Sequence, residues 1–511
     1  MTTRTLFSLS LALALALTAQ PASTQERQLG WIEFANSGAA SAQKDFIEGA
    51  LLLHSFEFED AATAFRRAQS VDPSFALAFW GEAMSYNHPL WRQQDKPAAL
   101  AALNRFAASP AQRQSMAPTP REAAYLQAVD VLYGDGSKSE RDRAYMDAMA
   151  RIADAYPQDL EARAFYALAI IGSTDGERDF ATYMRAAVVA QTVFNENAQH
   201  PGAVHYIIHS FDDPIHAPLG LEAARAYAGI APGAGHAQHM TSHIFVAMGM
   251  WDDLVAANIR ARDVQNARNA ELGRKANVCG HYTSWLHYGW LQRGEIEKAE
   301  QGMAECHDRV LEGGAPDEVG YFVAMRARHV LDLGDWDAAD RLSADVSDPR
   351  YDFITGVAAI KRGDRAGAQA ALTRMPTEGN PRGTIARQEL AALIAVDDGD
   401  RNGAIGLLTE AAALEETLPF EFGPPASPQP PHELLGAVYL TADRPADAVV
   451  AFRKALEFTP DRMASLVGLA AASQAAGDVA TVNDIMSRLQ KNLQHGDAAF
   501  LSRMGFGGER R

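Results

Sequence analysis

A pattern near the start of the chain returns almost unchanged near its end. The first copy reads GALLLHSFEFEDAATAFRRAQSVDP and the second reads GAVYLTADRPADAVVAFRKALEFTP. The matched positions are Gly49, Ala61, Phe65, Ala68 and Pro73 in the first copy, and Gly436, Tyr439, Ala448, Phe452, Ala455 and Pro460 in the second. Small residues at these positions let two antiparallel helices pack closely, and the proline stops the second helix. One such hairpin leaves a face uncovered, so hairpins must stack to bury it.

Glycines mark the turns between the two helices of further hairpins along the chain. They are Gly249 in MGMW, Gly294 in RGEI, Gly334 in LGDW, Gly363 in RGDR and Gly399 in DGDR. Glycine commonly ends a helix because it adopts the left-handed conformation without strain. Together with the two copies, these turns resemble the tetratricopeptide repeat (TPR) superfamily over nearly all of the mature chain. The resemblance implies an all-α, TPR-type solenoid of antiparallel helix hairpins, a right-handed superhelix that holds ligands in its concave groove.

The first 22 residues are typical of a secretory signal peptide, with Arg4 before an apolar stretch from Leu6 to Leu17 and small residues at Ala19 and Ala22. That stretch falls short of the roughly 20 residues needed to span a bilayer. We therefore expect a periplasmic or secreted protein without a transmembrane segment in its mature form. The predicted division is a signal peptide at 1–22, an N-terminal linker at 23–40, the solenoid at 41–495 and a C-terminal tail at 496–511.

Two segments interrupt the helical pattern. Residues 107–122 are expected to form a loop, and the proline-rich stretch at 418–431 cannot be helical throughout. The second is interpreted as a linker between repeats; the alternative is a flap over the groove, with His432 and Glu433 at its end. Cys279 and Cys306 are the only two cysteines, and the sequence leaves open whether they pair or remain free.

The net charge of −18, from 46 basic and 64 acidic residues, makes nucleic acid an unexpected partner. An unknown small molecule or peptide in the groove is the expected ligand. The chain contains no HExxH, no phosphate-binding glycine loop and no GxSxG with partners. These absences argue against the common metalloproteases, nucleotide-binding proteins and serine hydrolases.

Histidines are concentrated in the repeats at 200–290. His205 and His209 are four residues apart, His239 and His243 are four apart, and the second pair follows the first by one repeat length of 34 residues. Residues four apart share a helix face, so both pairs are expected on the groove-facing side of neighbouring first helices. His236 lies one turn before His239 on the same side.

Imidazoles from two packed helices could converge on one metal ion. An all-nitrogen ligand set suits copper or zinc, and also iron or nickel, and disfavours magnesium and calcium. The predicted ligands are His205, His209, His239 and His243, with His236 as a further ligand. A metal-dependent oxidoreductase or hydrolase, a metal store and a metal-free peptide-binding scaffold all remain open at this point.

Further polar residues are candidates for supporting roles. Asp212 and Asp213 could orient imidazoles, although ending their helix before Pro214 is an equal explanation. His54, His88 and His281 could reach the same cavity, whereas His200 is expected as a turn residue.

The histidine blocks carry a second, more specific resemblance. The segments HPGAVHYIIHSFDDP and HAQHMTSHIF are similar to those of a group of exported bacterial TPR proteins. That resemblance implies a fold and a compartment, and no activity.

Overall fold

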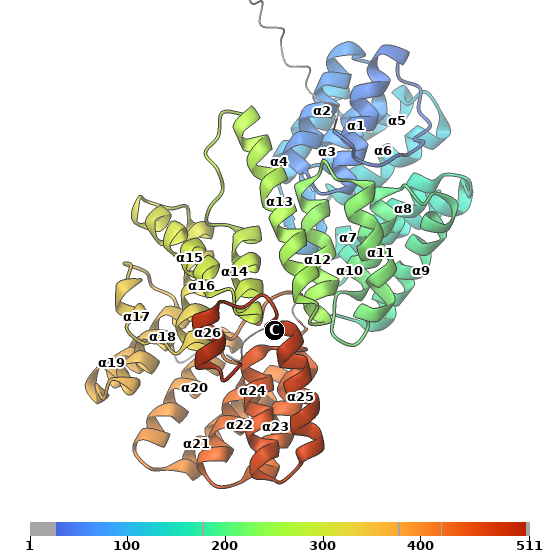
Figure 1. Cartoon of the computed structure of the whole chain (residues 1–511). Helices are drawn as coiled ribbons and strands as arrows, with labels where there is room; N and C mark the ends of the chain where they lie inside the picture. The colour runs from blue at the N-terminus through green and yellow to red at the C-terminus, as the bar shows by residue number, and fades with distance from the viewer. Residues whose placement is uncertain (1–26, 176–177, 377–378, 421, 507–511) are drawn as a thin grey trace, which may run out of the picture.

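The computed structural model describes residues 27–175, 178–376, 379–420 and 422–506, and the predicted signal peptide lies outside them. This part of the chain is all-α apart from one short antiparallel pair, β1 (Asn87–His88) and β2 (Gln93–Gln94). Consecutive helices form antiparallel hairpins that stack side by side, so the fold is the expected helical-hairpin solenoid (Figure 1). No helix among the described residues is both long and apolar enough to cross a bilayer.

The N-terminal half of the solenoid runs to the long helix α13 (Figure 1). Its helices are η1 (Ala40–Ala42), α1 (Gln43–His54), α2 (Phe58–Val71), α3 (Ala76–Met84), η2 (Pro89–Trp91), α4 (Lys96–Phe106), α5 (Pro110–Met116), α6 (Pro120–Leu132), α7 (Lys138–Ala155), α8 (Leu160–Gly172), α9 (Phe180–Glu196), α10 (Pro201–Phe211), α11 (Ala217–Ile230), α12 (Gly235–Ala247) and α13 (Trp251–Glu271).

The second half continues from α14 to the last described helix. Its helices are α14 (His281–Arg293), α15 (Ile296–Leu311), α16 (Pro316–Leu333), α17 (Ala338–Arg341), α18 (Pro349–Lys361), α19 (Arg365–Arg374), α20 (Pro381–Asp397), α21 (Arg401–Glu416), α22 (Pro431–Thr441), α23 (Pro445–Phe458), α24 (Met463–Ala475), α25 (Val479–Asn492) and α26 (Ala498–Arg503).

The two sequence copies fold in the same way. Phe65 on α2 packs so tightly between α1 and α3 that a Cβ on Gly49 or Gly81 would lie 2.9 or 2.4 Å from its ring. Phe452 on α23 is held in the same manner, and a Cβ on Gly436 would lie 2.8 Å from that ring. The small residues in the repeat are therefore required by an aromatic side chain that is inserted between helices. The five predicted turn glycines all have positive φ, between 64° and 84°.

The C-terminal hairpins fold back onto the middle of the array. The backbone N–H of Met463 on α24 donates to Gln292 of α14 at 2.8 Å, and the Trp251 indole donates to the Asp461 carbonyl at 3.2 Å. One continuous apolar core runs from the N-terminal helices to α15 and includes side chains of α23 to α26. The second half of the solenoid therefore curls into a ring in which α14 lies beside α24.

Three segments differ from the simplest expectation. Residues 107–122 are not one loop: Pro110 begins α5, because proline suits the first helical turn and the Ser109 side chain caps it by accepting from Gln112 N. The described part of the predicted linker is extended and buries Leu29, Ile32 and Phe34 in the core. The predicted tail contains α26, which Phe500 attaches to the core.

Cys279 and Cys306 are joined by a disulfide that fixes the start of α14 to α15. Replacing both by alanine should lower the free energy of unfolding by about 3 kcal/mol, because the unfolded chain loses a cross-link that closes a loop of 27 residues. Denaturant unfolding without reductant measures this difference. Adding reductant to the wild type should reproduce it, and equal stability of the two proteins would contradict it.

Candidate metal centre

Six histidines from three successive first helices meet at the middle of the molecule. His205 and His209 come from α10, His236, His239 and His243 from α12, and His281 begins α14. Helices α10 and α12 lie side by side (Figure 1). The predicted register is therefore confirmed: both histidine pairs lie on neighbouring first helices and turn toward each other.

The imidazoles form two adjoining groups rather than one. In the first triad, His205, His209 and His236, the nearest ring nitrogens all lie within 4.8 Å of one another. The second triad, His239, His243 and His281, meets the same limit. The ring centroids of His209 and His243, one from each triad, are 5.6 Å apart. The four histidines predicted around one ion thus fall into two neighbouring triads, which a further group of His209, Asp212 and His243 connects within the same limit.

In the first triad, hydrogen bonds fix which nitrogen faces inward. The Nδ1–H of His205 donates to the carbonyl of His54 at 2.6 Å, and that of His209 donates to Asp212 Oδ2 at 3.1 Å. Their Nε2 atoms, and that of His236, are buried and have no hydrogen-bond partner among the described residues. Buried nitrogens without a partner are costly unless something else binds them.

The second triad shows the same arrangement. The Nδ1–H of His239 donates to Asn258 Oδ1 at 2.6 Å, and that of His243 donates to Asp212 Oδ2 at 3.1 Å. Both Nε2 atoms then carry lone pairs, yet they lie only 3.1 Å apart. His281 Nε2 lies 2.9 Å from His239 Nε2. Two lone pairs cannot hydrogen-bond to each other, so this geometry leaves both atoms available to a cation between them.

Protons are poor candidates for that cation because burial disfavours charged imidazoles. Burial, and then the neighbouring imidazoles, hold the pKa of His205 and His239 well below 6.5. The same causes lower the pKa of His236 well below 6.5 and that of His281 to about 3. Neutral imidazoles are the form that binds transition metals.

Asp212 links the two triads. Its Oδ2 accepts from His209 and His243, while its Oδ1 lies 2.7 Å from Arg178 Nη1. Burial raises the pKa of Asp212, but Arg178 and the two histidine hydrogen bonds outweigh burial and hold that pKa below its ordinary value. A carboxylate that orients ligand imidazoles through Nδ1 is a common feature of metal sites. Asp213 instead pairs with His216, at 2.9 Å.

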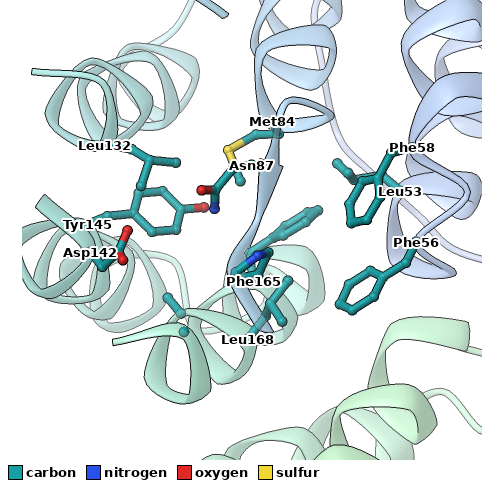
Figure 2. Close-up of a pocket in the computed structure, with 13 residues that line it drawn as sticks. Leu53, Phe56, Phe58, Met84, Asn87, Leu132, Asp142, Tyr145, Phe165 and Leu168 are labelled. Atoms are coloured by element: carbon teal, nitrogen blue, oxygen red, sulfur yellow. The ribbon is translucent and has the colours of Figure 1, made fainter. Parts of the chain in front are cut away.

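Aromatic side chains enclose both triads. Phe56 adopts a left-handed backbone conformation at φ 56°. The centroid of its ring lies 4.3 Å from that of His205 and 5.5 Å from that of His236. Phe56 also lines an apolar pocket together with Phe58 and Phe165 (Figure 2). Trp285 stacks on His243 with ring centroids 4.8 Å apart. These walls lower the local dielectric around the imidazoles.

The proline-rich segment covers the second triad. Phe422 stacks on His243 at 5.5 Å, and Gly423 lies against Trp285 so closely that a Cβ would be 2.8 Å from the indole. The segment therefore lies over the groove and is more than a linker between repeats. His432 at its end pairs with Glu416 at 2.9 Å and does not join the triads.

Two of the supporting histidines lie elsewhere. His54 Nε2 is 2.6 Å from Glu161, which also binds His200 at 3.1 Å, and this group is fully buried. His54 contributes to the first triad only through its backbone carbonyl. His88 stacks on Phe58 at 4.0 Å and joins none of the groups.

Sequence reasoning missed Asn258, which binds His239, and Glu161, which binds His54 and His200 outside the two triads. His200 was expected only as a turn residue. Asn258 lies on the second helix of the hairpin, and only the packed structure shows that it reaches His239. No spacing rule connects Glu161 to His54 and His200, because these residues come from three different hairpins.

No protein-family model and no curated protein matches the chain. Among solved structures, it is similar to human IFIT1 in a dimer with m7Gppp-AAAA, at 12% identity over 90% of this chain and 91% of that chain, with a TM-score of 0.35. Yeast Tom70 is similar at 10% identity, with 89% and 90% covered and a TM-score of 0.33. The Cut9–Hcn1 complex is similar at 12% identity, with 86% and 78% covered and a TM-score of 0.35. The assignment of the site therefore depends on the chain's own geometry.

Proposed function

We propose that this protein binds two transition-metal ions, one at each histidine triad. The observation that carries the proposal is the convergence of Nε2 lone pairs, above all those of His239 and His243 at 3.1 Å. Their Nδ1 atoms are already committed as donors, so neutral imidazoles leave these lone pairs for a metal.

Copper and zinc are the preferred ions because all six donors are imidazole nitrogens in an apolar enclosure, with iron or nickel as further candidates. Each triad supplies three ligands, which leaves a coordination position open for a substrate or water. This arrangement suits a metal-dependent enzyme better than a store, in which protein ligands close the coordination sphere.

The proposed compartment is the periplasm or the exterior. An exported protein meets oxidising conditions, which favour the pairing of Cys279 with Cys306. We further assign the chain to the TPR superfamily on its repeated hairpins, in which Phe65 and Phe452 have the same surroundings.

Elemental analysis tests the proposal. Protein purified without a histidine tag, stripped with a chelator and reloaded with copper(II) or zinc(II), should retain close to two ions per chain after dialysis. A metal-free scaffold, the alternative function, would retain neither ion. Values near zero after reloading with copper(II), zinc(II), iron(II) or nickel(II) in turn would refute metal binding. Azide or cyanide that changes the copper spectrum would support an open position.

A further inference from the structure

A cavity of about 620 Å³ opens directly onto the second triad. Its wall includes His281 and continues along α14, α16, α18 and α20 to the segment at 422–428, which covers one side. This volume lies within the range of about 300 to 1,000 Å³ that is typical of small-molecule sites. The cavity therefore has the size of a substrate site. Because His281 lines it, it also lies next to the proposed metal centre.

One buried charged side chain in the cavity wall forms no ion pair among the described residues. Arg328 on α16 is 7% exposed, and no carboxylate among the described residues forms an ion pair with it. Its Nη2 donates to the Pro425 carbonyl at 3.2 Å, its Nη1 is 3.5 Å from Ser284 Oγ, and its Nε has no partner in the described chain. Burial lowers its pKa to about 10, a value at which the guanidinium is still charged near neutral pH.

The other charged groups near Arg328 form no ion pair with it among the described residues. Arg350 is paired with Asp348 at 2.8 Å, and Asp332 is occupied by Arg462, the residue just before α24. Asp317 and Glu415 also line the cavity, but neither is paired with Arg328. A buried guanidinium with free donors binds carboxylates through charge-assisted hydrogen bonds.

The rest of the wall near His281 is aromatic. Trp285, Tyr321 and Phe422 line the cavity, and the Tyr321 hydroxyl lies 3.4 Å from His281 Nδ1. An apolar body would contact these rings while a carboxylate meets the guanidinium. We propose that this cavity binds a small organic acid with an apolar, ring-sized body, and that Arg328 holds its carboxylate. The acid site itself does not depend on the proposed metal centre. Only the idea that the bound acid is a substrate of that centre rests on the proposed function.

Calorimetric titration with phenylacetate and with phenylacetamide, its neutral equivalent, tests the proposal on the wild type. We expect phenylacetate to bind at least about tenfold more tightly, the effect of one charged hydrogen-bonded partner. Arg328→Gln should abolish this preference and Arg328→Lys should restore part of it. Arg350→Gln is the matched control, because that arginine lines the same cavity but is already paired, and it should keep the preference.

The titrations are made with metal-free and with copper-loaded protein, which separates this inference from the proposed function. Arg328-dependent binding of phenylacetate to protein that takes up no metal would support the acid site and refute the metal centre. Two bound ions with equal affinity for phenylacetate and phenylacetamide would overturn the acid site alone. Loss of binding in Arg350→Gln to the same extent as in Arg328→Gln would also overturn the role given to Arg328.

Discussion

Replacing His281 by alanine should reduce bound copper or zinc from two ions per chain to one. His281 supplies one of three nitrogens in the second triad and none in the first. A structural zinc site is worth about 10 to 16 kcal/mol over four ligands, so one ligand contributes about 3 kcal/mol and its loss weakens binding about 100-fold. The ion count after dialysis against a competing chelator measures this loss.

His236→Ala is the matched variant for the first triad. It should also leave one ion, and the His236→Ala/His281→Ala double variant should leave none. His432→Ala is the control, because His432 pairs with Glu416 away from both triads. It should retain two ions. A single-site centre would appear as complete loss in either single variant, which would contradict two separate sites.

The single substitution Asp212→Asn should weaken the binding of both metal ions. The carboxylate accepts from a ligand in each triad, and loss of such an orienting group typically costs about 10- to 100-fold in metal affinity. Equal weakening of the two sites would distinguish this role from that of the ligands themselves.

Sequence reasoning reached the histidine pairs because the repeat length and the helix period together define a face. Those two rules placed His205, His209, His239 and His243 on neighbouring helices, as the structure has them. They could not divide the four between two triads. That division depends on how α12 packs against its neighbouring helices, which whole side chains determine.

The repeat length and the helix period could not predict the position of the proline-rich segment or the buried polar partners of the histidines. The segment at 418–431 lacks periodicity, so only the fold-back of the C-terminal hairpins brings Phe422 onto His243. His54 precedes His88 by one repeat length of 34 residues, as His205 precedes His239, yet its ring is hydrogen-bonded to Glu161 and Tyr206. Spacing along one helix predicts a shared face well, whereas contacts between distant hairpins follow from the superhelix as a whole.

Acid should unfold the metal-free protein steeply. Burial, the main cause, lowers the pKa of five imidazoles in the two triads, and all five should return to about 6.5 in the unfolded chain. These histidines are His205, His209, His236, His239 and His281. Below pH 6.5 the unfolded state therefore binds protons that the folded state does not, so stability is highest above pH 6.5 and falls as the pH decreases toward the folded-state values.

The size of this effect follows from linkage. Between pH 6.5 and 5.5, a histidine whose folded-state pKa lies well below 6.5 costs about 1 kcal/mol of unfolding free energy, so His205, His236, His239 and His281 together cost on the order of 4 kcal/mol. Denaturant unfolding of chelator-treated protein at these two pH values measures the loss. His281→Gln removes one titrating group whose folded-state pKa is about 3, and it should reduce the loss by about 1 kcal/mol.

Phe422→Ala is the control for the acid effect, because it removes a ring that stacks on the second triad but no titrating group. It should keep most of the wild-type loss of stability between the two pH values. Parallel pH profiles for the wild type and His281→Gln would contradict a neutral, buried His281.

Bound copper or zinc should stabilise the folded protein, since a metal binds the folded triads and only weakly the dispersed imidazoles of the unfolded chain. Protons must then displace the metal before they can charge the imidazoles. The metal-loaded protein should therefore remain folded at a pH where the metal-free protein has unfolded, and this difference should disappear in the His236→Ala/His281→Ala variant.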